Sequence, residues 1–238
     1  MDSLCIVMPA YNEQSNIESV IEQWYPIVEK YNGNGSSRLV VIDDGSKDDT
    51  YKIVCELSKN KPLLVSMTKE NGGHGSTVLS GYRYALEGEF DWVFQTDSDG
   101  QTNPQEFELF WEQREKYDAI IGDRQATRED GFSRVLVENV LRLIIKIIFG
   151  NLDIPDANAP FRLMKRELVG KYIEKMPVDY NLPNVMLTTY FVYYNEKIKF
   201  EKISFAPRRG GENSINIRKI CMIGWKALGD FISLRRNM

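Results

Sequence analysis

The stretch Trp92-Val93-Phe94-Gln95-Thr96-Asp97-Ser98-Asp99-Gly100-Gln101 carries two carboxylates directly after a mostly apolar run. The apolar run predicts a buried β-strand, and side chains that alternate along a strand direct Asp97 and Asp99 to the same face. Two oxygen donors held together at a strand end suit a hard divalent cation that keeps open positions for substrate phosphates. An isolated Asp-x-Asp is most often a solvated turn. The surrounding chain is therefore needed to decide between a solvated turn and a metal site.

Strand and helix patterns alternate along the first 125 residues. Apolar runs predict five strands, at residues 4–8, 38–42, 63–67, 92–95 and 119–121, and a further strand is expected at 198–206. The segments between the first five predicted strands show the apolar periodicity of helices, and Ser46 is the expected N-cap of the second helix. This order predicts an α/β fold with a Rossmann-like, mostly parallel sheet and helices on both faces. Ligands bind such sheets at the carboxyl ends of the strands.

Polar loops follow the predicted strands at those ends. They are Pro9-Ala10-Tyr11-Asn12-Glu13, Asp43-Asp44-Gly45-Ser46, Asn71-Gly72-Gly73 and Asp97-Ser98-Asp99. Asp43 and Asp44 could accept hydrogen bonds from a nucleobase imide or a ribose hydroxyl, although helix capping is the alternative. The backbone amides of Asn71-Gly72-Gly73-His74-Gly75-Ser76 lie close to a predicted helix N-terminus, which is a good place for an anion. His74 is the single histidine, and it is either structural or a ligand contact.

Composition limits the classes of protein that fit. The 238 residues, of which 42 % are hydrophobic and 27 % charged, are ordinary for one large globular domain. No signal peptide is expected, and Cys5, Cys55 and Cys221 show no spacing typical of a disulfide framework or a zinc site. A reducing cytosol is therefore the expected compartment. No stretch reaches the roughly 20 apolar residues that a membrane span needs.

Charge is unevenly distributed along the chain. The net charge is −4, yet residues 207–238 hold seven basic and two acidic side chains. This distribution indicates either an anionic partner such as a membrane surface or a helix with solvated charges. The apolar segment Val135–Ile148 carries Glu138, Arg142 and Lys146 at every fourth position, which predicts an amphipathic helix rather than a span. That helix either packs on the domain or lies at a membrane surface.

Taken in order, the strand-end motifs resemble those of family 2 glycosyltransferases. The resemblance covers about the first 125 residues and rests on Val7–Glu13, Val41–Thr50, Asn71-Gly72-Gly73 and Asp97–Gln101. The chain is most similar to the dolichyl- and polyprenyl-phosphate sugar synthases. The features that indicate this branch are Gln101, the Gly122-Asp123-Arg124 run with Arg128 and Arg134, Asp156 before Phe161-Arg162, and the Arg208-Arg209-Gly210-Gly211 loop. His74, Ser76 and the segment Ala157–Pro160 depart from the family pattern.

The resemblance implies a GT-A fold and an inverting, metal-dependent transfer. It implies a catalytic domain over residues 1–214, with a nucleotide-sugar half (1–125) and an acceptor half (126–214), followed by a basic amphipathic helix over 215–238. The implied nucleotide-sugar contacts are Pro9, Tyr11, Glu13, Asp43, Asp97 and Arg209. The implied ligands of Mg²⁺ or Mn²⁺ are Asp97, Asp99 and Gln101, and the implied acceptor-phosphate contacts are Arg124, Arg134 and Arg162. Asp99 and Arg124 would be the catalytic residues.

The type of acceptor follows from the arginines and from the lack of an obvious base. A phosphate monoester is largely a dianion at neutral pH, so it needs guanidinium groups to place it rather than a base. Residues 178–184 contain no Glu-Asp pair. We therefore expect transfer onto a polyprenyl (dolichyl or undecaprenyl) phosphate by a cytoplasmic protein peripheral to the membrane. The expected partners are a nucleotide-diphosphate sugar and this lipid, without nucleic acid, and a homo-oligomer is compatible with the sequence.

Three other functions compete with this one. A hydroxyl acceptor in cell-surface polysaccharide synthesis would use Asp156 or Asp179 as base. A nucleotide-binding regulatory protein without activity is disfavoured by the intact Asp pair and Gln101. A sugar-1-phosphate nucleotidyltransferase needs a glycine-rich basic loop after the first strand, and Pro9-Ala10-Tyr11-Asn12 is not such a loop.

Overall fold

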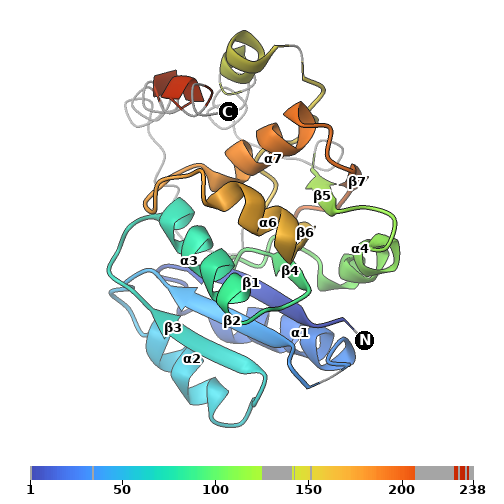
Figure 1. The fold of residues 1–238 in the computed structure, drawn as a ribbon. Coiled ribbons are helices and arrows are strands. Elements are labelled where there is room, and N and C mark those ends of the chain that lie inside the picture. The colour runs from blue at the N-terminus through green and yellow to red at the C-terminus, as the bar shows by residue number, and fades with distance from the viewer. Residues whose placement is uncertain are drawn as a thin grey trace.

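A single seven-stranded sheet forms the centre of the molecule (Figure 1). The computed structural model describes residues 2–33, 35–124, 141, 143–150, 152–206, 228–229, 231–233 and 235. The strands are β1 (Leu4–Ala10), β2 (Arg38–Asp43), β3 (Leu64–Thr68), β4 (Trp92–Gln95), β5 (Ala119–Asp123), β6 (Arg162–Lys165) and β7 (Ile198–Lys202). Their order is β3-β2-β1-β4-β6-β5-β7, and only the two pairs formed by β6 are antiparallel. The mostly parallel sheet expected from the sequence is confirmed.

The order of the strands creates a switch point between β1 and β4. The chain runs from β1 outward to β2 and β3, then returns to the other side of β1 to form β4. The connection that follows β1 therefore leads to one side of the sheet, and the connection that follows β4 leads to the other. Open α/β sheets bind their ligands outside the carboxyl ends of the two strands at such a switch point. β1 and β4 pair in parallel from Leu4↔Trp92 to Val7↔Gln95, so the loop with Asp97 begins at the switch point.

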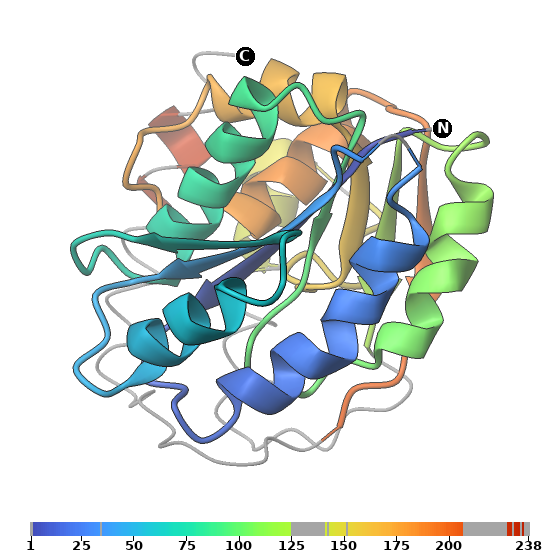
Figure 2. The same ribbon diagram turned by 90° about the horizontal axis from the view of Figure 1, so that it is seen from below.

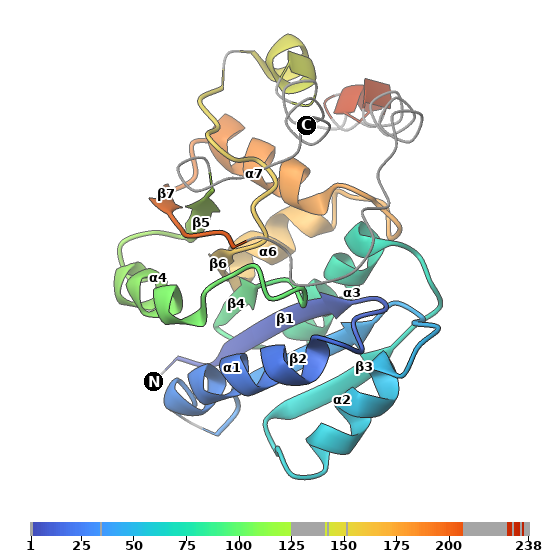
Figure 3. The ribbon, with the colours of Figure 1, turned by 180° about the vertical axis from the view of Figure 1, so that it is seen from behind.

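Two layers of helices cover the sheet (Figure 2). One layer holds α1 (Ile17–Lys30), α2 (Thr50–Ser58) and the short η1 (Pro104–Glu106) with α4 (Phe107–Gln113), as Figure 3 shows. The other holds α3 (His74–Glu87), α6 (Arg166–Ile173) and α7 (Pro183–Tyr193). Alternate residues of β1 serve the two layers, because Ile6 packs with the α1 layer and Val7 with the α3 layer. α3 approaches β1 so closely that a Cβ on Gly81 would lie 2.2 Å from Val7 Cγ1.

The second layer extends beyond the sheet through two further helical segments. Residues 143–149 are helical and lie beside the helical residues near 228–235 (Figures 1 and 3). The rings of Phe149 and Phe231 are 6.2 Å apart, and both are buried with α7. The remaining residues of the two predicted amphipathic helices lie outside the described residues, and the division at residues 125, 126, 214 and 215 stays a prediction. Within the described residues, no helix combines the length and apolar character needed to cross a bilayer.

Two local expectations were wrong, and one strand was not expected. α2 begins at Thr50, and the Ser46 hydroxyl accepts a hydrogen bond from the Asn12 amide instead of capping the helix. The strand expected over 198–206 ends at Lys202, after which Phe205 forms an isolated bridge with Thr102. β6 was not predicted, because its four residues begin and end with basic side chains and show no apolar run.

Candidate active site

The loops after β1 and β2 form one hydrogen-bonded rim. The Asn12 amide donates to Ser46 Oγ, and the Lys47 amide donates to Asn12 Oδ1, each over 2.9 Å. Asn12 has a positive φ of 53°, a conformation in which asparagine is favoured among residues with side chains. Glu13 is buried, and its Oε2 accepts from Asn16 Nδ2 at the start of α1. Tyr11 on this rim is 41 % exposed, which leaves its ring accessible to a ligand.

Asp43 at the end of β2 presents an unpaired buried oxygen. Its Oδ2 accepts hydrogen bonds from the Ser46 amide and from Thr68 Oγ1, both over 3.1 Å. Its Oδ1 is buried and has no hydrogen-bond partner among the described residues. Buried polar atoms in folded proteins are almost always paired, and an unpaired one carries a free-energy cost. Asp43 Oδ1 is therefore the acceptor in this site that most needs a donor from a ligand.

Asp44 binds the next loop of its own chain. Its Oδ1 accepts from Lys69 Nζ at 2.7 Å and from the Gly72 amide at 2.9 Å, and its Oδ2 accepts from the Gly73 amide at 2.8 Å. Burial opposes ionisation of this carboxyl, but the hydrogen bonds from Gly72 and Lys69 outweigh it and hold the pKa of Asp44 below its usual range. Two amides of the predicted anion-binding segment, those of Gly72 and Gly73, thus bind the Asp44 carboxylate, and anion binding by the rest of the segment stays a prediction.

The acidic pair lies in a folded loop after β4. Asp97 Oδ1 is 3.1 Å from Nε2 of His74, the first residue of α3. Asp99 Oδ1 accepts from the Gln101 amide, and Gly100 between them has a positive φ of 72°. Gln101 Nε2 donates to the Ala206 carbonyl over 2.8 Å, so its Oε1 is the atom left to ligate a cation.

This donor set fits a divalent cation that also binds substrate. Two carboxylates and one amide oxygen are the hard ligands that Mg²⁺ and Mn²⁺ take. In the described part of the chain, no group of three or more His, Cys, Asp or Glu side chains converges to hold a metal. A cation at Asp97, Asp99 and Gln101 therefore needs further oxygens, which the diphosphate of a nucleotide can supply.

Arg124 and Asp156 form a buried ion pair at the end of β5. Arg124 Nε lies 2.7 Å from Asp156 Oδ2 and Nη2 lies 3.0 Å from Oδ1, and both side chains are 3 % exposed. Asp156 Oδ1 also accepts from the Asn158 amide. Both Asp156 oxygens are therefore engaged in hydrogen bonds, and this geometry disfavours Asp156 as a catalytic base.

The Arg162 side chain is buried too deeply to contact a bound ligand directly. It is fully buried at the start of β6, and its guanidinium donates to the carbonyls of Ala157, Ala159 and Asn184. Burial lowers the pKa of this guanidinium, and Tyr82, Asp156 and Asp97 act against that shift. A direct contact with an acceptor phosphate requires these hydrogen bonds to break. The structure thus places Arg162 beneath the site, whereas Arg128, Arg134 and Arg209 lie outside the described residues.

Sequence reasoning missed a buried polar group next to Asp97. The Tyr82 hydroxyl of α3 donates its one proton to Gln95 Oε1 over 2.6 Å and lies 3.2 Å from Asn184 Oδ1. Gln95 is the last residue of β4, two positions before Asp97. Tyr82 falls on the apolar face of a helix and Asn184 follows a proline, so neither carries a signal in the sequence. The group links the donor side of the site to α7.

The sheet, its switch point and the carboxylate pair define the GT-A class of glycosyltransferases. The chain belongs to glycosyl transferase family 2, whose model matches residues 5–173. The GT-A fold and the family expected from the sequence are therefore confirmed.

Curated relatives of this family include two that act on polyprenyl phosphates by name. An undecaprenyl-phosphate 4-deoxy-4-formamido-L-arabinose transferase of Proteus mirabilis is 23 % identical over 177 residues, covering 73 % of this chain and 52 % of the relative. A dolichyl-phosphate beta-glucosyltransferase of Trichomonas vaginalis is 27 % identical over 175 residues, covering 68 % and 53 %. The match thus spans about half the length of each relative.

Solved structures show the same fold. Glucosyl-3-phosphoglycerate synthase of Mycobacterium tuberculosis, crystallised with Mn²⁺, uridine diphosphate and glucosyl-3-phosphoglycerate, superposes with a TM-score of 0.69 at 19 % identity. The superposition covers 98 % of this chain and 80 % of that one.

Proposed function

We propose that this glycosyltransferase is metal-dependent and moves a sugar, with inversion, from a nucleotide-diphosphate sugar to a polyprenyl phosphate at the cytoplasmic face of a membrane. The observation that carries the donor half is the unpaired, buried Oδ1 of Asp43, on the same edge of the sheet as the acidic loop. The relatives named for transfer to undecaprenyl and dolichyl phosphate support the acceptor half.

The nucleoside lies over the rim formed by the first two loops. Asp43 Oδ1 accepts a hydrogen bond from the base imide or from a ribose hydroxyl, which relieves its unpaired state. Tyr11 contacts the nucleoside with its exposed ring, while Pro9 and the buried Glu13 shape the rim below. The structure of Mycobacterium tuberculosis glucosyl-3-phosphoglycerate synthase contains uridine diphosphate, which supports a nucleotide ligand for this fold.

The diphosphate lies at the switch point. Asp97, Asp99 and Gln101 Oε1 would hold Mg²⁺ or Mn²⁺ there, and a cation bound by them would supply positive charge against the charge on the departing nucleoside diphosphate. Gln101 is fixed for this role from its other side, because its amide nitrogen is bound to Ala206. Arg209 adds a second positive charge to the phosphates.

The acceptor phosphate approaches at the end of β5. One of its oxygens forms a bond to the anomeric carbon while the bond between that carbon and the diphosphate oxygen breaks, which inverts the configuration. The dianion needs no base at neutral pH. The engagement of both Asp156 oxygens with Arg124 supports a mechanism without a base in this place. Arg124 and Arg134 orient the phosphate, and Arg162 holds the loop whose Asp156 pairs with Arg124.

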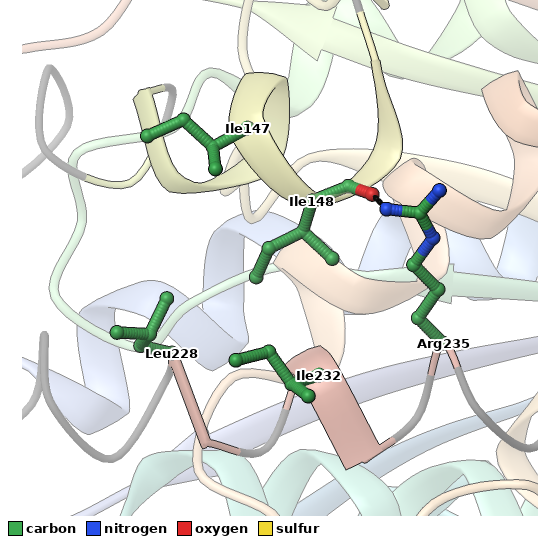
Figure 4. A pocket seen from close by; sticks show the side chains of 5 residues that line it. All are labelled: Ile147, Ile148, Leu228, Ile232 and Arg235. Carbon is green, nitrogen blue, oxygen red and sulfur yellow. Dashed lines mark hydrogen bonds between the residues drawn. The ribbon is translucent and has the colours of Figure 1, made fainter.

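Contact with the membrane involves the two helical segments above the sheet. Leu143, Ile147 and Ile232 are large apolar residues with 57 %, 68 % and 41 % of their surface exposed. A pocket of about 450 Å³ opens between these segments, lined by Ile147, Ile148, Leu228, Ile232 and Arg235 (Figure 4). Exposed apolar side chains beside basic ones are typical of peripheral membrane contacts.

A hydroxyl acceptor is the second candidate. Asp179 is exposed, and the adjoining backbone of Tyr180 and Asn181 packs against Gly75, next to His74 and the acidic pair. This position makes Asp179 the remaining candidate base for the expected alternative, transfer onto a growing polysaccharide.

A panel of donors and acceptors tests the proposal. The protein is incubated with uridine- and guanosine-diphosphate sugars, Mn²⁺ or Mg²⁺, and undecaprenyl or dolichyl phosphate, and lipid products are identified by mass spectrometry. A polyprenyl-phosphate sugar is expected, and Asp99→Asn should abolish it while the exposed Asp179→Asn leaves it unchanged. Transfer only to glycan hydroxyls, with loss of activity in Asp179→Asn, would establish the second candidate instead.

A further inference from the structure

Arg162 lies between the two halves of the site. In the register of the sheet it is opposite Gln95 of β4 and opposite Ile121 of β5. The chain continues from Gln95 to Asp97 in the metal loop, and from Ile121 to Arg124 on the acceptor side. One fully buried cation is therefore flanked by the two strand ends that carry the donor and acceptor functions.

On the acceptor side, Arg162 fixes the loop that carries Asp156. Its Nη2 and Nε donate to the Ala159 carbonyl over 2.6 and 2.9 Å, and Nη2 also reaches the Ala157 carbonyl at 3.4 Å. Asp156 immediately precedes these residues and forms the bidentate pair with Arg124. The position of Arg124 thus depends on a loop that Arg162 holds.

On the donor side, Arg162 reaches the polar group beneath the metal loop. Its Nη1 donates to the Asn184 carbonyl over 3.2 Å. Asn184 Oδ1 in turn lies 3.2 Å from the Tyr82 hydroxyl, which donates to Gln95 at the end of β4. A continuous chain of contacts therefore runs from Gln95 through Arg162 to the loop of Asp156.

The planar guanidinium is essential to this arrangement. It donates in several fixed directions at once, whereas a lysine ammonium is a compact point charge with three donors. A lysine at position 162 preserves the positive charge between Asp97 and Asp156 but cannot reach the carbonyls of Ala159 and Asn184 with the same geometry.

We propose that Arg162 is a positioning residue that sets the separation between the nucleotide–metal site and the acceptor-phosphate site. This inference rests on the proposed function, and it replaces the direct phosphate contact expected from the sequence. In-line transfer requires both reactants at close to attack distance, and a misplacement of about 1 Å can cost roughly 100-fold in rate. The nucleotide–metal site and the acceptor-phosphate site each keep their own ligand-binding residues when Arg162 is changed. Binding of the nucleotide should therefore survive the change, whereas transfer of the sugar from the nucleotide to the acceptor should be slowed.

The test compares Arg162→Lys with Ser37→Ala. Ser37 is a matched control because it is also fully buried, and its hydroxyl binds Leu4 and Tyr31 at the opposite, amino-terminal edge of the sheet. Arg162→Lys should lower kcat for polyprenyl-phosphate transfer by about 10- to 100-fold. Its Kd for uridine diphosphate with Mn²⁺, measured by calorimetry, should change by less than about threefold, a difference well under 1 kcal/mol. Ser37→Ala should lower Tm and leave kcat unchanged.

Several results would overturn the inference. A wild-type kcat in Arg162→Lys would do so, and so would a loss of nucleotide affinity as large as the loss of kcat. Should Arg162→Lys fail to fold, Thr188→Val replaces it, because Thr188 Oγ1 accepts from Arg162 Nη1 and donates to the Ala157 carbonyl. An unchanged kcat in that variant counts equally against the proposal. A wild-type protein that transfers no sugar to any polyprenyl phosphate would instead overturn the proposed function, and with it the acceptor site.

Discussion

Replacing Asp43 by asparagine should weaken nucleotide binding without weakening the fold. The side-chain carbonyl of the introduced asparagine can still accept from the Ser46 amide and from Thr68 Oγ1, the two partners of Asp43 Oδ2. The amide nitrogen then takes the place of the unpaired Oδ1 and presents a donor where the ligand also presents one. A hydrogen bond to a charged group contributes about 1.5–3 kcal/mol, so affinity should fall roughly 10- to 150-fold.

Calorimetric titration of uridine diphosphate in the presence of Mn²⁺ measures this loss. Asp91→Ala is the control, because it removes the carboxylate that accepts from the amide and hydroxyl of Ser3 at the far edge of the sheet. That variant should lose stability and keep its affinity, whereas Asp43→Asn should lose affinity and keep its Tm. Wild-type affinity in Asp43→Asn, or a fall in Tm as large as that of Asp91→Ala, would refute the assignment of Asp43 Oδ1 to the ligand.

Three further predictions concern stability. Gly75→Ala should destabilise by about 1–3 kcal/mol in urea unfolding, because the new Cβ would lie 2.4 Å from the Asn181 carbonyl oxygen; Gly170→Ala within α6, where the nearest atom is 3.4 Å away, should instead stabilise by up to about 1 kcal/mol. Asp156→Ala should cost about 3–5 kcal/mol in the same assay, since it removes the carboxylate that pairs bidentately with the buried Arg124. The pKa of Asp44 is lower in the folded protein than in the unfolded chain, where it is about 3.9. The Asp44 carboxylate therefore stabilises the fold above about pH 3.9, and this stabilisation is lost as the pH falls through the lower pKa of the folded protein. Tm should therefore fall more steeply below about pH 4 in the wild type than in Asp44→Asn.

Each of these has a contrary result. Equal stability of the two glycine variants would show that the Tyr180–Asn181 backbone does not pack against α3 as described. An Asp156→Ala protein as stable as the wild type would contradict the buried ion pair. Parallel Tm curves for wild type and Asp44→Asn at acid pH would contradict the binding of the Gly72 and Gly73 amides by Asp44.

The sheet was predictable because buried parallel strands are continuous apolar runs, and Leu4–Met8 is such a run. The site loops were predictable because the carboxyl ends of parallel strands meet at one edge. The roles of Asp43 and Asp44 were not, since two adjacent carboxylates look alike in sequence. Only the fold shows that one binds the Gly72-Gly73 loop while the other keeps an oxygen for a ligand.

The role of Arg162 was hidden by the missed strand β6. This strand enters the sheet antiparallel between β4 and β5, which carries Arg162 to the centre of the molecule. A Phe-Arg motif near other arginines indicates a phosphate contact when the strand is not recognised. Once the strand is in place, burial and the carbonyls around the guanidinium indicate a positioning role.

The metal–diphosphate site at the switch point is the central claim, and anomalous scattering from crystals grown with MnCl₂ and uridine diphosphate tests it most directly. We expect a manganese peak in contact with Asp99, Gln101 Oε1 and the diphosphate, with Asp97 beside it and the nucleoside hydrogen-bonded to Asp43 Oδ1. A bound nucleotide without manganese at these residues, or manganese bound elsewhere on the chain, would contradict the account.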